Sequence, residues 1–554
     1  MTRNDVCAQP KTSGRLVSFL QSPDSYPHHL STVRMIETHI SWVFIASPFV
    51  FKVKKPVDLG FADFSTLEKR KHFCERELAL NRRLCPDVYL EVVPIYERGG
   101  TLSFTPGDQI IEYALKMREL PDGWFLNQLL IRHEVGEDEI NRIVARLHDF
   151  YAAENPSAEI EEWGRPAKLK LSTDENFVQI KPFIGKTITR AAFETIRHYT
   201  SSFFESHERL FQERIARRRI LDCHGDLRLE HVHITPDAVT IFDCIEFNDR
   251  FRFIDIANDL AFLAMDFDFE GRHDLANLFL RTAARAFGDP GILKLTDFYK
   301  CYRAVVRGKV ESIAAITEHI RNTDEHARRA QLYFRLALRY AVIGSEPGLL
   351  VIMGRVATGK SSVAVQLASE LDWPVFSSDQ IRKSVAGLPL TERTPTERRA
   401  QLYSEQAKRE VYAKLVHDGL AAVSQFGGAV IDATFSRRAD RHYLREEARR
   451  TGVGLQLIEL DAPNEQLVAR LRARAAAISG NSDAREEDFE KLDALYESAG
   501  TDEYVIEMQA SGAVANTSQA VMRALATKQA DGHGFELFAS KHERSADPLS
   551  LVQG

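Results

Sequence analysis

The chain has 554 residues, a length that predicts three or four folding units of about 150 residues each. Its 44% hydrophobic and 27% charged residues are an ordinary globular composition, which excludes a collagenous, low-complexity or broadly disordered chain. The net charge of -7 excludes a global basic field, so a nucleic-acid partner would need a local basic patch. Six cysteines without a C-x-x-C pair argue against a disulfide framework and against a zinc site.

The first residues, MTRNDVCAQPK, contain no apolar signal segment. No run of the sequence approaches the roughly 18 apolar residues that a membrane span needs. We therefore expect a cytoplasmic protein without a membrane partner, and we assign residues 1–29 to an N-terminal extension. The composition does not predict an oligomeric state.

The amino-terminal half begins with sheet and helix patterns. Residues 36–57 are rich in β-branched and aromatic side chains and are broken at Ser47-Pro48, which predicts an antiparallel hairpin. Residues 64–84 repeat apolar side chains at helical spacing, which predicts a helix. Short strands are expected at 89–97 and 102–104. The following region, to about residue 340, is mostly helical in pattern with a strand-rich interruption at 220–247.

The turn-rich segment 344–348 (GSEPG) separates this helical region from the apolar strand LLVIM. Beyond it, predicted strands alternate with helices, which favours a parallel sheet covered on both faces. We place a first domain at 30–344 and a second at 345–530. Residues 531–554 are polar without periodicity and are expected to be a flexible C-terminal tail.

A phosphate-binding motif follows the first strand of the second domain. It matches G-x-x-x-x-G-K-[ST] and consists of Gly354, Arg355, Val356, Ala357, Thr358, Gly359, Lys360 and Ser361, with Ser362 next in the chain. The strand before it and the helical pattern after it are the context that the motif requires. The backbone N–H groups and the helix N-terminus are expected to hold phosphates, Lys360 to contact the β and γ phosphates, and Ser361 to ligate Mg²⁺.

Polar residues that could serve an acceptor follow two later strands. Asp379 could orient or deprotonate an acceptor hydroxyl, and Arg382 could hold an acidic group on that acceptor. Asp432 could reach the Mg²⁺ water shell as a Walker B acid does. The alternatives are a helix N-cap for Asp379, a solvated helix face for Arg382 and a turn carboxylate for Asp432.

Two arginines of the segment RLRAR share one helical face because they are four residues apart. Arg470 and Arg474 could close over the transferring phosphoryl group as a lid. Exposed helix charge is the alternative.

Together, the segments GRVATGKSS, SSDQIRK, VIDATF and RLRAR resemble the small P-loop kinases grouped with gluconate kinase, the polynucleotide 5′-kinase domain and zeta toxins. The resemblance covers about residues 348–530. It implies a three-layer α/β fold and transfer of a γ-phosphoryl group from ATP to a hydroxyl or small polar acceptor. The acceptor stays open, because these relatives share the phosphate cradle and differ in the acceptor pocket.

A second phosphotransfer signature lies at 224–243. The run HGDLRLEH is followed by a strand that ends at Asp243. This pattern resembles aminoglycoside phosphotransferases and choline-kinase-like enzymes, relatives of the protein kinases. The resemblance covers about residues 30–335 and implies an α+β bilobal kinase fold. By this match Asp226 receives the acceptor proton and Asp243 holds Mg²⁺.

The same resemblance assigns roles upstream and downstream. It implies that Lys52 pairs the α and β phosphates and that Glu77 anchors this lysine, with Lys54 and Glu75 as competitors. It also matches residues 112–117 to the linker between the lobes and Asp255 to the helix aspartate that supports the catalytic loop.

His231 departs from the family pattern, which has a metal-ligating Asn at this position. Imidazole is a poor substitute because Mg²⁺ prefers oxygen ligands. Either Glu230, Glu246 or water replaces the ligand, or the domain holds one metal, or the domain is catalytically weak.

The leading hypothesis is a bifunctional phosphotransferase with two kinase-type domains, each using ATP and Mg²⁺ on small polar hydroxylated acceptors. A first alternative makes the amino-terminal domain a pseudokinase that binds a ligand and regulates one active P-loop kinase. A second makes the carboxyl-terminal domain a kinase for nucleic-acid 5′-ends or nucleotide sugars. A third is a nonenzymatic, nucleotide-driven scaffold.

Overall fold

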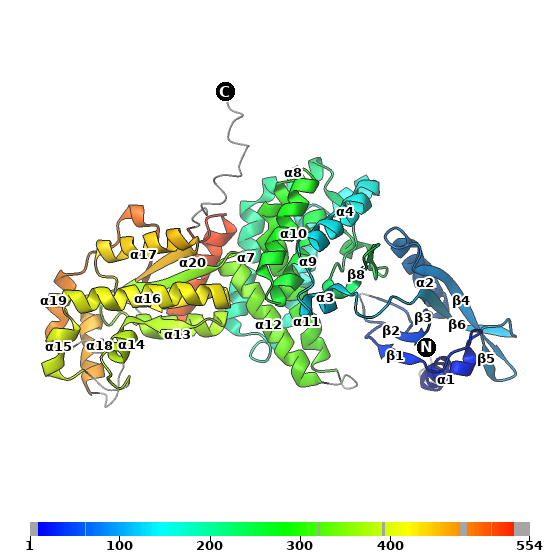
Figure 1. Ribbon diagram of the computed structural model, residues 1–554, viewed down its shortest axis with the longest axis horizontal. Coiled ribbons are helices and arrows are strands. Elements are labelled where there is room, and N and C mark those ends of the chain that lie inside the picture. The colour runs from blue at the N-terminus through cyan, green and yellow to red at the C-terminus, as the bar shows by residue number, and fades with distance from the viewer. Residues whose placement is uncertain are drawn as a thin grey trace, which may run out of the picture. The chain divides into compact units, whose positions relative to one another are not determined.

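The computed structural model describes residues 9–60, 62–317, 322–390, 394–476, 485–510 and 512–536. Figure 1 shows the course of the chain. The described residues form two compact units. The first consists of Met1–Lys170 and Arg209–Tyr299, and the second of Leu171–Glu208 and Lys300–Gly554. Helices α6 (Pro166–Ile180) and α11 (Gly291–Ala314) have residues in both.

The first unit begins with a six-stranded antiparallel sheet of order β1-β2-β3-β6-β4-β5. Its strands are β1 (Arg34–Glu37), β2 (Ser41–Ala46), β3 (Phe49–Lys54), β4 (Tyr89–Arg98), β5 (Thr101–Ser103) and β6 (Gln109–Arg118). The predicted hairpin is β2 and β3, which turn at Ser47-Pro48. In β3 the side chains alternate between the two faces, so Lys52 and Lys54 share one face.

Two helices belong to this sheet. Helix α2 (Leu67–Arg82) packs on β4 and β6 and begins at Thr66, whose hydroxyl accepts a hydrogen bond from the backbone of Lys69. Helix α1 (Gln9–Gln21) contributes Leu16 and Leu20 to a core that also contains Phe44 and Phe51. Part of the predicted N-terminal extension is therefore a helix packed on the sheet.

The rest of the first unit is mostly helical, and it carries the strand-rich interruption that the sequence predicts. The interruption forms two small antiparallel sheets. Their strands are β7 (Ile220–Asp222) with β10 (Phe253–Asp255), and β8 (Val232–Ile234) with β9 (Val239–Ile241). The helices are α3 (Leu126–Ile131), α4 (Glu137–Ala153), α5 (Ala158–Glu162), α8 (Glu208–Ala216), α9 (Ile256–Phe269) and α10 (His273–Ala286). A sheet lobe followed by a helical lobe is the kinase-like bilobal fold that the sequence predicts.

The second unit contains a five-stranded, fully parallel sheet of order β12-β13-β11-β14-β15. The strands are β11 (Gly348–Gly354), β12 (Val375–Ser377), β13 (Gly428–Asp432), β14 (Gly454–Asp461) and β15 (Val505–Gln509). The sequence predicts the first four. All residues of β11 and β13 are buried, as expected for strands covered on both faces.

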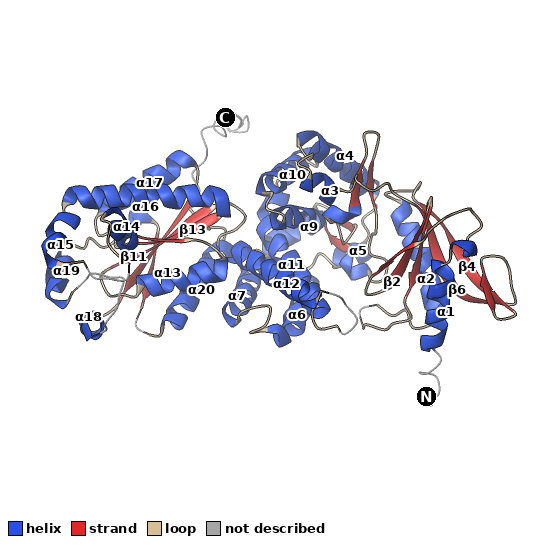
Figure 2. Ribbon diagram, turned by 60° about the horizontal axis from the view of Figure 1, so that its bottom comes forward, coloured by secondary structure: helices blue, strands red, loops and turns tan. Residues whose placement is uncertain are grey.

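Helices cover both faces of this sheet. The helices that contact its strands are α13 (Lys360–Leu371), α14 (Ser378–Val385), α16 (Glu405–Phe426), α17 (Arg438–Thr451) and α20 (Val514–Ala530). The other helices of this region are α15 (Thr396–Leu402), α18 (Asn464–Ala476) and α19 (Phe489–Ala494). Figure 2 shows α16 and α17 on one side of the sheet and α13 and α20 on the other. The predicted three-layer α/β fold is confirmed.

Two helices that precede residue 344 pack in the second unit. Helix α7 (Arg190–Ser206) lies against α20, and α12 (Thr323–Val342) lies against α7, α13 and α20. Arg339 of α12 donates hydrogen bonds of 2.8 and 3.3 Å to the carbonyls of Leu371 and Asp372, where α13 ends. Sequence places these helices in the first domain, whereas packing groups them with the P-loop sheet.

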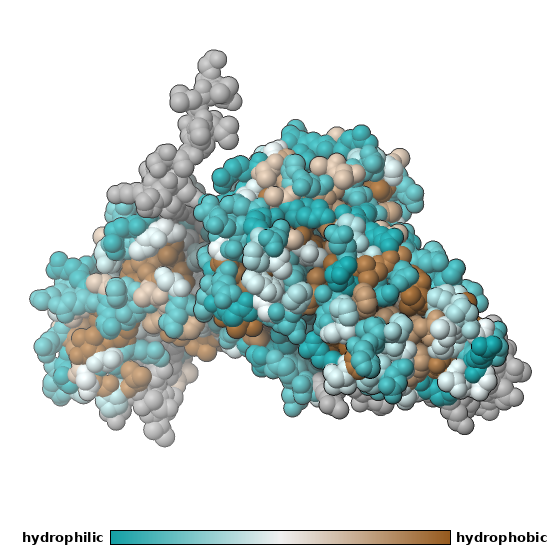
Figure 3. All heavy atoms as spheres, turned by 45° about the vertical axis from the view of Figure 1, so that its right-hand side comes forward, coloured by the Kyte–Doolittle hydropathy of each residue, from teal (hydrophilic) through white to brown (hydrophobic). Residues whose placement is uncertain are grey.

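The surface of the described residues is mixed. The most exposed large apolar side chains include Ile131 and Val178, which lie on separate helices. Figure 3 shows hydrophobic residues interspersed among hydrophilic ones on the face that it draws. Within the described ranges, every helix is too short or too polar to cross a lipid bilayer.

We expect Arg339→Ala to lower the melting temperature of the second unit by about 3 to 6 °C, because it leaves the carbonyls of Leu371 and Asp372 at the end of α13 without a charged donor. Arg335→Ala is the matched control on the same helix, since its ion pair with Asp372 is exposed, and it should change the melting temperature by less than about 2 °C. Thermal unfolding of the full chain measures both. Equal shifts for the two variants would contradict the capping role of Arg339.

Candidate active sites

The phosphate cradle of the second unit is a turn between β11 and α13 that needs unusual backbone angles. Gly354 has φ of 133°, and a Cβ atom there would lie 2.2 Å from the carbonyl oxygen of Leu460, so a side chain is excluded. Ala357 and Gly359 also have positive φ, at 63° and 98°. Gly359 is the N-cap of α13, so the N-terminus of this helix opens into the turn.

Lys360 folds back over the cradle. Its Nζ donates a 2.6 Å hydrogen bond to the carbonyl of Arg355, and the Thr358 hydroxyl donates to the same carbonyl at 2.9 Å. The ammonium group thus lies over the backbone that is predicted to surround the phosphates. A phosphate in the turn can replace the Arg355 carbonyl as the partner of Lys360.

The Arg355 side chain points away from this role. Its guanidinium donates to Asp461 at 2.7 and 2.9 Å, to Asn464 at 2.6 Å and to Asp493 at 2.9 Å. These contacts attach the cradle to β14, α18 and α19. Arg355 therefore contributes its backbone to the cradle, while its side chain fixes the turn in place.

Three oxygen-bearing side chains meet where the carboxyl ends of β12 and β13 lie beside the first turn of α13. Asp432 ends β13 opposite Ser377 of β12, and its carboxylate accepts hydrogen bonds from Ser361 and Ser377. Burial raises the pKa of Asp432 above its ordinary value, and the charge of Lys360 opposes this rise. Hydroxyl and carboxylate oxygens are the donors that Mg²⁺ prefers, so Ser361 and Asp432 fit this ion.

Asp379 and Arg382, both on α14, form an ion pair with each other. The guanidinium of Arg382 lies 4.4 Å from the ring centre of Tyr403, and it is buried. Burial opposes its charge, but Asp379 holds the pKa of Arg382 above the ordinary value. The N-cap of α14 is Ser377, so the alternative of an N-cap role for Asp379 is wrong, and so is a solvated face for Arg382.

Arg470 contacts the cradle directly. Its guanidinium donates to the carbonyls of Ala357 and Thr358 at 3.3 and 3.1 Å and to that of Ala510 at 2.6 Å. It therefore links α18 to the turn and to the end of β15. Arg472 points outward to Glu486. Arg474 lies on α18, but its side chain is outside the described residues, so its predicted lid role stays a prediction.

A second cluster of charges lies in the first unit. Lys52 donates to Glu77 of α2 at 2.8 Å and to Asp243 at 2.5 Å. Lys54 donates to the other oxygen of Glu77 at 2.7 Å and also to Glu246. The groups form a chain of alternating charge, in the order Asp243, Lys52, Glu77, Lys54 and Glu246.

Exposure separates the two lysines of this chain. The Lys52 side chain is 12% exposed and that of Lys54 is 1% exposed. Lys52 is therefore the lysine that can reach a bound molecule, while Lys54 is enclosed. Glu75, the competitor of Glu77, pairs with Lys71 on the surface of α2.

Asp243 has a left-handed backbone, with φ of 65°. Burial favours its protonated form, but Lys52 and His231 hold the pKa of Asp243 well below its ordinary value. It is thus a carboxylate at neutral pH. Burial raises the pKa of Glu246, against the opposing charge of Lys54.

The loop that carries Asp226 is held by Asp259 of α9. The Asp259 carboxylate accepts hydrogen bonds of 2.9 Å from the backbone N–H groups of both His224 and Gly225, and one of 2.8 Å from the Tyr151 hydroxyl. The sequence interpretation that gave this role to Asp255 is wrong. Asp255 caps α9 and forms a buried ion pair with Arg214. Asp255 and Asp259 lie one helical turn apart, and the sequence pattern does not distinguish their roles.

The predicted linker at 112–117 is also wrong, because these residues lie within β6. The chain leaves the sheet lobe after Arg118. Glu112 instead accepts hydrogen bonds from Arg70 of α2 at 2.8 and 3.0 Å and helps to hold that helix on the sheet.

His231 lies between the two aspartates of the signature. Its Nδ1 is 2.9 Å from the Asp226 carbonyl, and its Nε2 is 3.6 Å from Asp243 Oδ2. Glu230 forms an ion pair with Arg228, and its Oε1 also lies 3.8 Å from His231 Nε2. The structure therefore brings Lys52, Glu77, Asp243 and His231 together next to the Asp226 loop.

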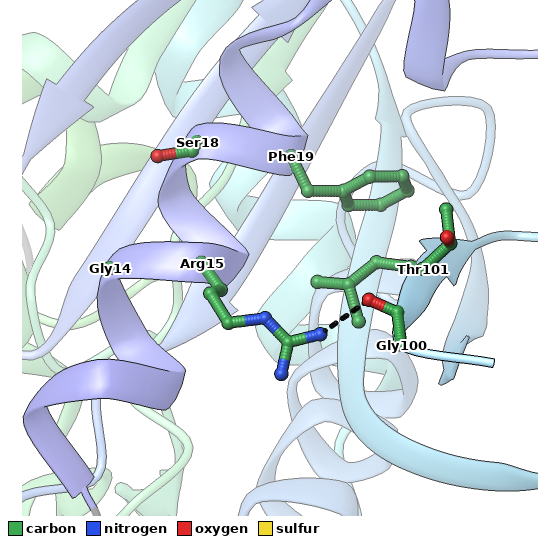
Figure 4. A pocket seen from close by; sticks show the side chains of 7 residues that line it. Gly14, Arg15, Ser18, Phe19, Gly100 and Thr101 are labelled. Carbon is green, nitrogen blue, oxygen red and sulfur yellow. Dashed lines mark hydrogen bonds between the residues drawn. The ribbon is translucent and has the colours of Figure 1, made fainter. Parts of the chain in front are cut away.

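A shallow pocket lies apart from both clusters. It is formed by Gly14, Arg15, Ser18 and Phe19 of α1 and by residues 100–102, with a volume of about 650 Å³ (Figure 4). Arg15 crosses it to donate a 2.8 Å hydrogen bond to the Gly100 carbonyl. The pocket contains none of the predicted site residues.

Comparisons with known proteins agree with the second unit's geometry. Residues 349–499 match the family model described as AAA domain. A gluconokinase of Gluconobacter oxydans is 29% identical over 139 residues, which is 24% of this chain and 68% of that protein. The chain is an enzyme of the kinase class.

An uncharacterized protein of Mycobacterium tuberculosis is similar to this kinase over most of its length. It is 29% identical over 461 residues, which is 81% of this chain and 87% of that protein. This match spans residues of both units.

Solved structures similar to parts of this kinase include a gluconokinase from Sinorhizobium meliloti 1021, at 19% identity and a TM-score of 0.26, covering 34% of this chain and 95% of that chain. A choline kinase from Cryptosporidium parvum Iowa II is 12% identical with a TM-score of 0.37, covering 59% and 94%. An aminoglycoside 2'-phosphotransferase-IIIa is 13% identical with a TM-score of 0.34, covering 58% and 98%.

We expect Arg470→Ala to weaken binding of an ATP analogue to the P-loop domain about tenfold, because the cradle carbonyls of Ala357 and Thr358 lose the donor that ties them to the end of β15. Isothermal titration of the full chain measures this, in an Asp243→Ala background that disables the kinase-like domain. Arg472→Ala is the matched control on the same helix and should leave the affinity within about twofold. An unchanged affinity of Arg470→Ala for the ATP analogue would show that the hydrogen bonds from Arg470 do not hold the cradle in its binding conformation.

Proposed function

We propose that this chain is an ATP- and Mg²⁺-dependent phosphotransferase with two heads, each transferring a γ-phosphoryl group to a hydroxyl of a small polar acceptor. The heads are the kinase-like domain at 30–344 and the P-loop domain at 345–530. One observation carries the proposal. The phosphate cradle, the metal-ligating oxygens of Ser361 and Asp432, and the Asp379–Arg382 ion pair lie at one edge of the parallel sheet. A cytoplasmic location would give both heads access to ATP.

In the P-loop head, the backbone N–H groups of the turn and the N-terminus of α13 bind the phosphates. Lys360 leaves the Arg355 carbonyl and pairs the β and γ phosphates. Ser361 and Asp432 hold Mg²⁺, which neutralises charge on the phosphates when it is bound. Arg470 keeps the turn in position from α18.

Asp379 is the base of this head. It accepts the proton of the acceptor hydroxyl as the new oxygen–phosphorus bond forms and the bond from the γ phosphorus to the β–γ bridging oxygen breaks, leaving ADP. Arg382, stacked on Tyr403 and buried beside Asp379, favours an acceptor that carries an anionic group. When that group binds, the guanidinium of Arg382 pairs with both the acceptor and Asp379.

In the kinase-like head, Lys52 is held by Glu77 at the position from which it contacts the α and β phosphates. Asp226 accepts the acceptor proton, and Asp259 fixes its loop through the backbone of His224 and Gly225. Asp243 carries the negative charge that holds the divalent cation.

The acceptors are small hydroxylated molecules. The names gluconokinase and choline kinase, borne by proteins to which the two halves are similar, are consistent with such acceptors. The pairing of Arg382 with Asp379 favours a sugar acid for the P-loop head. The net charge of -7 argues against a nucleic-acid acceptor.

We expect Asp379→Asn to lower the turnover number of the P-loop head at least about 100-fold, because asparagine cannot take the acceptor proton. The measurement is ADP release by the full chain against a panel of sugar acids, polyols and amino alcohols. Asp226→Asn should have the same effect on acceptors of the kinase-like head and none on those of the other. Asp418→Asn, which changes a carboxylate paired with Lys414 on α16, is the control and should leave both activities unchanged.

If phosphorylation of the same acceptor persists unchanged in Asp379→Asn and also in Asp226→Asn, neither head performs it and the proposal is contradicted. If Asp226→Asn leaves every activity unchanged while Asp379→Asn abolishes turnover, the kinase-like domain is a binding module, which is the pseudokinase alternative.

A further inference from the structure

The hydrogen bonding of His231 fixes which ring nitrogen faces Asp243. The Nδ1 atom lies 2.9 Å from the backbone carbonyl of Asp226, and a carbonyl oxygen only accepts, so Nδ1 carries the donated proton. The other ring nitrogen, Nε2, is then the one available to ligate an ion. That atom lies 3.6 Å from Asp243 Oδ2. A nitrogen atom and an oxygen atom that can each ligate a cation thus face one another.

The spacing of these two atoms suits a shared ion. Two neighbouring ligands of an octahedral ion, each about 2.1 Å from it, lie about 3 Å apart. Small side-chain rotations of His231 and Asp243 close the difference. The other oxygen of Asp243, Oδ1, is occupied by Lys52 at 2.5 Å, so Oδ2 is the oxygen directed to the histidine.

Another acid of this segment is turned into the protein. Glu246 follows Asp243 in the chain, but its carboxylate is buried and forms an ion pair with Lys54. Lys54 is itself enclosed and bound to Glu77. Lys54 therefore holds the Glu246 carboxylate away from Asp243 Oδ2 and His231 Nε2, so Glu246 is not a candidate for a second metal ligand.

Among the described residues, His, Cys, Asp and Glu side chains nowhere gather in a group of three or more that could hold a metal ion. A cation between Asp243 and His231 therefore takes its other ligands from phosphate oxygens and water. Its binding should depend on the nucleotide.

We propose that Asp243 Oδ2 and His231 Nε2 together bind one divalent cation with the phosphates of the nucleotide, and that this oxygen–nitrogen pair favours Mn²⁺ over Mg²⁺. The inference rests on the proposed function of the kinase-like head. Mg²⁺ is a hard ion that selects oxygen, whereas first-row transition-metal ions accept imidazole readily. The residue that departs from the family pattern thus sets the metal preference of this head.

The test is electron spin resonance of the full chain with Mn²⁺ and the nonhydrolysable analogue AMP-PNP, in a Lys360→Ala/Ser361→Ala background that removes the P-loop head. We expect one Mn²⁺ per chain that depends on AMP-PNP and shows coupling to a ¹⁴N nucleus in the spin-echo modulation. The coupling should disappear in His231→Asn, and the preference for Mn²⁺ over Mg²⁺ should fall about tenfold. Asp243→Asn should lose the ion.

Glu75→Gln is the control, because it removes an exposed carboxylate of the same lobe that pairs only with Lys71 on the surface of α2. It should leave both the number of Mn²⁺ ions and their affinity within about twofold. AMP-PNP bound with Mn²⁺ but without ¹⁴N coupling would overturn the inference and leave the proposed function intact, as would a Glu75→Gln variant that weakens Mn²⁺ tenfold or more. Failure of AMP-PNP to bind this head at all would overturn both.

Discussion

Each head has to compensate the negative charge of a triphosphate from fixed groups, because the chain as a whole is acidic, with a net charge of -7. The two heads meet this constraint differently. The P-loop head uses backbone: a turn with three left-handed residues opens the N-terminus of α13, and Lys360 adds a side-chain charge. The kinase-like head uses an ion-pair chain in which Lys52 is balanced by Glu77 and Asp243. In both heads the lysine that contacts the phosphates lies on a regular element, Lys360 on α13 and Lys52 on β3.

The sequence predicts much of this arrangement because the cradle is a local feature. Gly354, Gly359, Lys360 and Ser361 all lie within one short motif of the chain, and the alternation of strands and helices predicts the parallel sheet around it. The strand β15 was not predicted; three of its five residues, Glu507, Met508 and Gln509, are poor signals for a strand. Contacts between distant segments were predicted only through family resemblance. Glu77 was placed in this way, whereas Asp259 was missed, because Asp255 is equally acceptable by pattern and only the backbone geometry separates them.

Packing adds a relationship that the sequence pattern hides. The GSEPG turn marks a change of composition, yet α7 and α12 before it lie against α13 and α20 behind it. The cap that Arg339 places on α13 connects a helix of the kinase-like sequence to the helix whose opposite end forms the phosphate cradle. A fragment cut at residue 344 would therefore expose the faces of α13 and α20 that α7 and α12 cover. Experiments on either head are best done by disabling the other in the full chain.

The central claim is that one chain holds two independent nucleotide sites. Equilibrium dialysis of the full chain against radiolabelled AMP-PNP and divalent cation measures it most directly. The account predicts two nucleotides per chain in the unaltered protein, one in Lys360→Ala, one in Lys52→Met and none in the double variant. A single nucleotide per chain in the unaltered protein, or two that persist in Lys360→Ala or in Lys52→Met, would contradict it.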